Sequence, residues 1–146
     1  MANKNIPGIY NLLQEIAWNF GDHGFNGECC GDLSLVEFMA LKRAYENSNF
    51  SIQEIGNSLN FTKSGATRVI DRLENKGYVT REHSPADGRV CCVTVTNKGL
   101  DILTEVAKKK TEYLEKALKN INPEIIDSIE KILKMLVESL QNQKSI

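Results

Sequence analysis

The 146-residue sequence has no unbroken apolar run long enough to cross a bilayer, and its first residues lack the apolar stretch of a secretory signal peptide. We therefore expect a cytoplasmic protein without a membrane partner. Unusual composition is absent as well, because 41% hydrophobic and 25% charged residues are typical of a soluble globular protein. The length suits a single domain over residues 1–146.

Catalytic and metal-binding motifs are also missing. The sequence has two histidines, His23 and His83, and no G-x-S-x-G, P-loop or H-E-x-x-H pattern. Ser84 follows His83, but neighbouring residues at a strand end point apart and form no dyad. No nucleophile, base and orienting group can be assembled, so the protein is not expected to be an enzyme, and no cofactor is implied. The four cysteines lack C-x-x-C spacing, which disfavours a structural zinc site.

The formal net charge is -1 and the pI is about 6.1, values that do not by themselves indicate a nucleic-acid ligand. The charge is unevenly distributed, however. Between residues 62 and 89 there are six Lys or Arg against four acidic residues, so this segment carries +2 and the remainder -3. Such a distribution predicts DNA binding that is confined to one face of the protein and is sensitive to salt.

What the sequence does contain is a winged helix-turn-helix pattern over residues 51–96. Ser51 and Glu54 form a capping box at the start of a short helix, and Asn60 allows the chain to turn after it. A second helix is predicted from Thr62, its N-cap, to a stop at Gly77. Four apolar residues at helical spacing predict its buried face: Ala66, Val69, Ile70 and Leu73.

The opposite face of this second helix is polar and basic. Its donors and cations suit base edges and phosphates, which is typical of the recognition helix of a DNA-binding lobe. We expect base contacts from Ser64, Thr67 and Arg68 near the N-terminal turns, and phosphate contacts from Lys63 and Arg72. An ordinary solvated helix face has the same composition, so the segment that follows decides between the two interpretations.

That segment has the pattern of a two-stranded hairpin. Residues 78–83 alternate, residues 90–96 are rich in Val and Thr, and Pro, Asp and Gly between them mark a turn. Arg89 at the predicted tip suits a narrow, electronegative minor groove, and Asp87 is close enough in sequence to orient it. Four further residues complete the predicted DNA-contacting set: Ser51 and Thr62 at the helix starts, and Arg81 and His83 on the first strand.

These motifs resemble the MarR family of bacterial and archaeal transcription regulators. Residues 62–81 are similar to that family's recognition helix and first wing strand, Asp87-Gly88-Arg89 to its acidic-x-Arg wing motif, and residues 95–99 to its Leu-Thr-Glu-Lys-Gly junction. The resemblance implies a triangular homodimer whose two winged lobes bind the halves of a pseudo-palindromic operator. It also implies repression, and a small lipophilic or phenolic effector.

Helix placement outside the lobe agrees with this resemblance. Apolar faces are predicted on a first helix from near Pro7, a long helix from about Asn97, and a last helix that starts at Pro123 after the N-cap Asn122. The expected fold is therefore mainly α with a small β wing: a winged helix-turn-helix lobe at residues 33–96, flanked by dimerisation helices at 6–22 and 97–142. The alternatives are an intramolecular three-helix bundle instead of the dimer, and a winged-helix module that contacts protein rather than DNA.

The four cysteines occur as two adjacent pairs. Cys91 shares a face of the second wing strand with neighbouring valines and is expected to pack beneath the wing, with Cys92 on the other face. Cys29 and Cys30 lie in a loop with glycines on both sides, which lets their sulfurs, with His23, approach a soft metal or an oxidant. Two interpretations of this pair stay open: small buried apolar residues, or a thiol-based or metal-responsive switch.

An effector pocket has no distinct sequence signal. Its candidate lining residues are Trp18, Phe20, Phe38, Met39 and Tyr45. Aromatic and Met residues at helical spacing are more typical of a core, so burial in the core is the simpler expectation for each of them.

Overall fold

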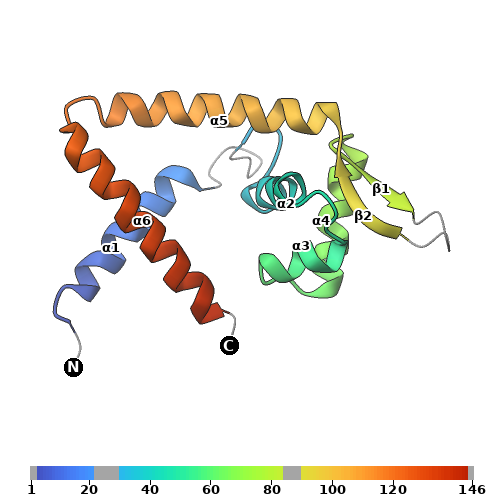
Figure 1. The fold of residues 1–146 in the computed structure, drawn as a ribbon, viewed down its shortest axis with the longest axis horizontal. Helices are drawn as coiled ribbons and strands as arrows, with labels where there is room; N and C mark the ends of the chain where they lie inside the picture. The colour runs from blue at the N-terminus through green and yellow to red at the C-terminus, as the bar shows by residue number, and fades with distance from the viewer. Residues whose placement is uncertain (1–2, 22–29, 84–89, 145–146) are drawn as a thin grey trace. The chain divides into compact units, whose positions relative to one another are not determined.

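The computed structural model describes residues 3–21, 30–83 and 90–144. In these ranges the chain forms α1 (Ile6–Phe20), α2 (Leu35–Glu46), α3 (Ile52–Ser58), α4 (Lys63–Asn75), β1 (Val79–His83), β2 (Val90–Val95), α5 (Asn97–Ala117) and α6 (Pro123–Lys144) (Figure 1). The predicted fold class, mainly α with a small β wing, is confirmed. The chain divides into two compact units, Met1–Thr104 and Glu105–Ile146.

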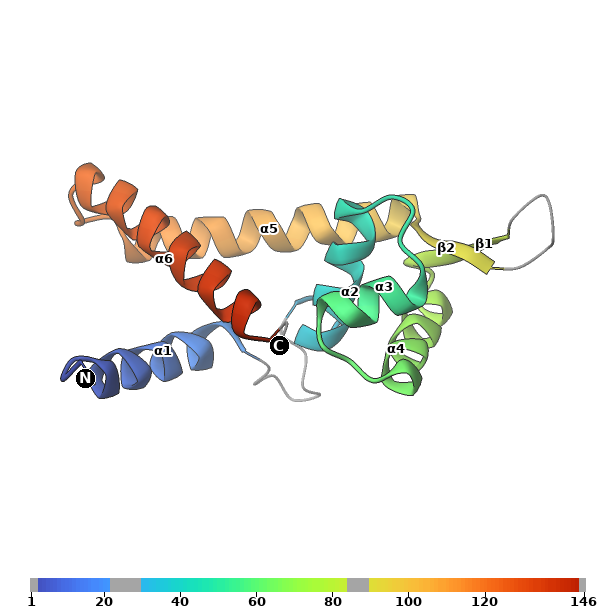
Figure 2. The same ribbon diagram turned by 60° about the horizontal axis from the view of Figure 1, so that its bottom comes forward.

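The core of the first unit lies between three helices and the root of the hairpin. Helices α2, α3 and α4 pack on one another, β1 packs on α4, and β2 packs on α2. The antiparallel hairpin projects beyond the three helices in both views (Figures 1 and 2). All four residues of the predicted apolar stripe of α4 are buried, as expected: Ala66, Val69, Ile70 and Leu73.

Local capping explains where α3 and α4 start. Ser51 Oγ accepts a hydrogen bond from the Glu54 amide at 3.0 Å, and Glu54 Oε1 accepts from the Ser51 amide at 3.3 Å, which confirms the predicted capping box. Thr62 Oγ1 accepts from the Gly65 amide at 3.0 Å and caps α4. The turn between the helices places Asn60 at a φ of 61°. At Gly56 an added Cβ would lie 2.7 Å from Ala66 Cβ, so glycine permits the close crossing of α3 and α4.

The end of α4, the start of β1 and the start of α5 meet at one hydrogen-bonded junction. Gly77 follows α4 with a φ of +83°, a left-handed conformation that favours glycine. Its carbonyl accepts from Thr96 Oγ1 at 2.7 Å, and Thr96 Oγ1 accepts from the Gly99 amide at 3.1 Å. Lys98 Nζ donates to the Lys76 carbonyl at 2.7 Å. The root of the wing is thereby tied to the first turn of α5.

The second wing strand is covered on both faces. Cys92 and Val93 are 5% and 0% exposed, although adjacent strand residues point to opposite sides. The Val93 amide donates to the Phe50 carbonyl at 2.9 Å, so the segment before α3 runs beside β2. We expected Cys91 to pack beneath the wing and Cys92 to lie on the opposite face of the strand. That opposite face is also buried, because Cys92 is 5% exposed. The side chain of Cys91 lies outside the described residues.

The helices outside the lobe leave large apolar side chains exposed. Helix α1 contains no buried residue. Trp18 of α1 is 65% exposed and Tyr45 of α2 is 51% exposed, so the expectation that these two are core residues is wrong for the single chain.

Asn122 Oδ1 accepts from the Glu124 amide at 2.9 Å, which confirms the predicted N-cap of α6. Among the helices described, none has the length and apolar character that a bilayer crossing requires.

Candidate nucleic-acid interface

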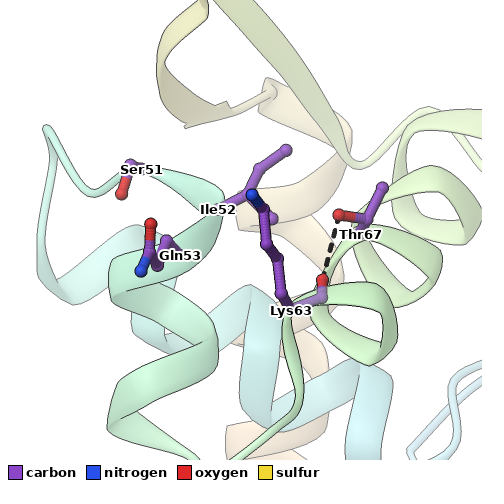
Figure 3. A pocket seen from close by; sticks show the side chains of 5 residues that line it. All are labelled: Ser51, Ile52, Gln53, Lys63 and Thr67. Atoms are coloured by element: carbon purple, nitrogen blue, oxygen red, sulfur yellow. Dashed lines mark hydrogen bonds between the residues drawn. The ribbon is translucent and has the colours of Figure 1, made fainter.

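The outer face of α4 and three residues at the start of α3, Ser51, Ile52 and Gln53, form one polar surface, called here the recognition surface. An open depression of about 820 Å³ is lined by Lys63, Ser64, Thr67 and Arg68. A smaller hollow of about 260 Å³ is lined by Ser51, Ile52, Gln53, Lys63 and Thr67 (Figure 3). Lys63 and Thr67 border both hollows, so the two are continuous. The residues predicted from sequence to contact bases lie together on this surface.

Two polar side chains of the recognition surface are already hydrogen-bonded. The Thr67 hydroxyl donates to the Lys63 carbonyl at 3.1 Å (Figure 3), so its proton is used within the helix while its lone pairs and methyl group remain for a partner. Thr62 Oγ1 lies 3.4 Å from Ser64 Oγ in addition to capping α4. Thr62 is therefore first a helix cap, and any phosphate contact would be additional.

The cations Lys63 and Arg68 differ in environment from the others predicted to contact DNA. Both are exposed, and neither forms an ion pair with any residue in the described part of the chain. Arg72 is also exposed, at 54% of its side chain, but its Nε lies 3.6 Å from a carboxylate oxygen of Glu37. Among the described residues, α4 thus presents two cations without an ion pair, Lys63 and Arg68, and a third, Arg72, whose Nε lies beside the Glu37 carboxylate.

Arg81 joins the wing to α4. Its NH1 donates to Glu74 Oε1 at 2.7 Å, and its NH2 donates to Asp71 Oδ1. The hydrogen bond to Asp71, together with the charges of Asp71 and Glu74, raises the pKa of Arg81 even though burial opposes the shift. The contact of Arg81 with DNA stays a prediction, and its guanidinium already has two carboxylate partners. The arrangement supports a role in holding the wing against the recognition helix.

Replacing Arg81 with methionine should therefore act mainly on the wing. Loss of both ion pairs is expected to lower the free energy of unfolding by about 1 kcal/mol, since the pairs are partly solvent-exposed, and to weaken DNA binding through a mobile wing. Urea denaturation and fluorescence anisotropy measure the two effects. Arg43→Met, which removes a single pair at 3.5 Å on α2, is the matched control. Weaker DNA binding with unchanged unfolding would show instead that Arg81 contacts DNA directly.

One buried residue of this region was missed from sequence. Glu37, at the start of α2, is 5% exposed and lies beside Arg72 of α4 and Lys76, the C-cap of α4. The signal was present, because Ser34 and Glu37 have the same spacing as the capping box of Ser51 and Glu54. Applied at residues 34–37, that rule would have predicted the start of α2. It could not have predicted the burial of the carboxylate.

The remaining predicted residues are only partly covered by the structure. His83 is exposed at the end of β1 and pairs with Val90 across the hairpin. Cys30 is buried and disulfide-bonded, and its backbone forms an isolated bridge with Leu33. Cys29, Asp87 and Arg89 lie outside the described residues. Within the described ranges there is no group of three or more His, Cys, Asp or Glu residues suited to hold a metal ion.

A helix-turn-helix with an exposed polar second helix, followed directly by a hairpin, defines a winged helix-turn-helix DNA-binding protein. The model of the MarR family matches residues 33–91. The HTH-type transcriptional regulator MhqR of Bacillus subtilis is 26% identical over 134 residues, which cover 92% of each chain. The uncharacterized HTH-type transcriptional regulator YsmB of the same organism is 30% identical over 107 residues, which cover 73% of each chain. The chain belongs to the MarR family of transcription regulators.

Solved structures agree with this assignment at the level of fold. A MarR family protein from Bacillus stearothermophilus has a TM-score of 0.79 and 24% identity, over 96% of this chain and 98% of that one. FabT of Streptococcus pneumoniae, solved in complex with DNA, has a TM-score of 0.76 and 24% identity, over 94% of this chain and 98% of that one. The shared fold therefore extends well beyond the winged lobe.

Proposed function

We propose that this MarR-family regulator is a repressor that binds a pseudo-palindromic operator as a homodimer and is released by a small-molecule, thiol or metal signal. The observation that carries the proposal is the recognition surface, where Lys63 and Arg68 are exposed beside Ser64 and Thr67 without acidic partners in the described residues. Unpaired cations next to hydrogen-bonding side chains suit a polyanion with readable base edges. The complex of FabT with DNA supports the same partner for this fold.

In the proposed complex with the operator, we assign a contact to each predicted residue other than Arg81. Ser64, Thr67 and Arg68 meet base edges in the major groove, as residues in the first turns of a recognition helix do. Lys63 and Arg72 meet phosphates. The start of α3 at Ser51, the start of α4 at Thr62, and His83 on the wing contribute further backbone contacts, and Arg89, oriented by Asp87, enters the minor groove.

The homodimer is supported by the apolar side chains that the single chain leaves exposed outside the lobe. They include Ile6, Leu12, Ile16 and Trp18 on α1, and Ile125, Ile132, Met135, Val137 and Leu140 on α6, each at least 46% exposed. Apolar surface of this extent is typical of an interface rather than of solvent-facing helices. We therefore assign residues 33–96 to DNA binding and residues 6–22 and 97–142 to dimerisation, with closed two-fold symmetry.

Repression follows from occupancy of a promoter, where the bound dimer blocks RNA polymerase. A ligand bound beside the dimer helices, or a thiol event at Cys29 and Cys30, would release the operator by changing the separation of the two recognition helices, which duplex DNA fixes at about one helical turn. Winged-helix binding to a protein instead of DNA is the alternative.

The test is selection of the purified protein against a randomised duplex library, followed by fluorescence anisotropy across a salt series. We expect enrichment of a pseudo-palindrome, called here the operator, with affinity that falls steeply with salt by about 0.9 log units per contacted phosphate for each decade of salt. Cys30 is disulfide-bonded in this structure, so operator affinity should differ between the reduced and the oxidised native protein, and this difference should be absent from the Cys29→Ser, Cys30→Ser double variant. Failure to enrich any sequence, with weak and equal binding to all duplexes, would favour the protein-contact alternative.

A further inference from the structure

Among the residues that the structure describes, Glu37 is the one charged side chain in the core, with 5% of its surface exposed. It forms a capping box at the start of α2, in which its Oε1 accepts from the Ser34 amide at 2.9 Å and its own amide donates to Ser34 Oγ at 3.1 Å. Glu54 forms the same box on α3 while staying exposed. Helix capping alone therefore does not require the burial of Glu37.

The second carboxylate oxygen of Glu37 lies beside two cations, Arg72 in the last turn of α4 and Lys76 at its C-cap. Its Oε2 is 3.2 Å from Lys76 Nζ and 3.6 Å from Arg72 Nε, and the described residues offer it no hydrogen bond. Lys76 Nζ also donates to the Asp32 carbonyl at 2.6 Å. One carboxylate thus connects the start of α2 to the C-terminal end of the recognition helix.

This carboxylate is ionised at neutral pH. Burial raises the pKa of Glu37, but the hydrogen bonds from Ser34 and Lys76 and the charge of Lys76 lower it by more, so the pKa lies below its ordinary value of 4.5. Solvent screens such a buried charge only weakly. Arg72 keeps 54% of its side chain exposed, so its guanidinium is held near Nε and is accessible beyond it.

We propose that Glu37 is a positioning residue for DNA binding, which orients the Arg72 guanidinium toward a DNA phosphate. The inference rests on the proposed function and adds to it a residue that itself touches no DNA. Arginine suits this arrangement because its planar fork can be anchored at Nε while its terminal nitrogens bind a second anion. A cation held in one orientation fixes the register of the protein on the duplex, which favours the operator over other DNA.

The experiment compares Glu37→Gln with Glu54→Gln as the matched control. Glutamine can retain the capping box at both positions, and each change removes one negative charge, but of the two only Glu37 forms ion pairs with Arg72 and Lys76 in the described structure. Affinities for the operator and for a shuffled duplex are measured by anisotropy, well below the midpoint of thermal unfolding. We expect Glu37→Gln to reduce the ratio of the two affinities about fivefold to tenfold, and Glu54→Gln to change it less than about twofold.

A double-mutant cycle separates positioning from a merely structural role. In an Arg72→Ala background, Glu37→Gln should reduce the ratio no further, because the residue through which it acts is gone. Arg72→Lys leaves the core intact, and because lysine keeps the charge without an Nε, it should retain affinity for the shuffled duplex and lose operator preference.

Two results would overturn the proposal: equal losses from Glu37→Gln in both backgrounds, or an unchanged affinity ratio in Arg72→Lys. A wild-type protein without any operator preference would contradict the proposed function instead, so the two failures are distinguishable.

Discussion

Replacing Ile132 with glutamate is expected to convert the proposed homodimer to a monomer and to weaken operator binding by about 100-fold or more, because the two half-sites are no longer bound together. Ile132 lies on α6 and is 62% exposed, so a carboxylate there costs the single chain little. In a dimer that uses this face, the same carboxylate would be buried without a partner. Light scattering coupled to size exclusion gives the oligomeric state, and anisotropy gives the affinity.

Lys134→Glu is the control for this substitution. It introduces the same side chain on the same helix, but two residues further along, which places it about 200° around the helix axis and away from the apolar face. We expect this variant to remain a dimer with near-native affinity. If the Ile132 variant stays dimeric, the interface lies elsewhere. If both variants dissociate, the loss is not specific to the apolar face of α6. A monomeric native protein would support the intramolecular alternative.

Replacing Arg68 with alanine is also expected to reduce operator affinity strongly. It should cost about 1–3 kcal/mol of operator binding, roughly 10- to 100-fold, with a much smaller loss on a shuffled duplex. Arg68 is exposed and lines the same depression as Ser64 and Thr67, and no described carboxylate holds it away from DNA. The long, donor-rich side chain is therefore available for a base edge. Anisotropy on both duplexes, each across a salt series, measures the effect.

Lys63→Ala provides the contrast for Arg68→Ala. As a predicted phosphate contact it should weaken binding to both duplexes by a similar factor and reduce the salt slope by about one unit. A variant of Arg68 that behaved in the same way would be a phosphate contact as well, and base recognition would then have to come from Ser64, Thr67 or the wing.

The winged lobe could be predicted because its signals are local. Side-chain caps at Ser51 and Thr62, a turn residue at Asn60 and a C-terminal glycine at Gly77 each act within a few residues of sequence, and all four occupy the predicted conformations. Helix α2 was not singled out, although its capping box is equally local. The apolar residues of α2 form a less clear stripe than those of α4. The start of α2 was predictable only from the capping box at residues 34–37.

The environment of each cation could not be predicted, because it depends on contacts distant in sequence. Lys63, Arg72 and Arg81 are alike as cations near a polar helix face, yet Arg81 pairs with two carboxylates of α4, Arg72 is held by Glu37 from α2, and Lys63 has no acidic partner among the described residues. Glu37 and Lys76 are 39 residues apart. Packing of the two helices, not sequence spacing, brings such groups together and removes them from solvent.

The junction at Thr96 gives α5 a mechanical role. Because one residue separates β2 from α5 and its hydroxyl is bonded on both sides, the first turn of α5 moves with the wing and the end of α4. A helix of 21 residues is about 31 Å long, so a tilt of about 10° displaces one end by about 5 Å relative to the other. The rise of one base pair is about 3.4 Å. Tilting α5 by this amount as a rigid rod would therefore displace its first turn, and the wing root bonded to it, by more than one base-pair step.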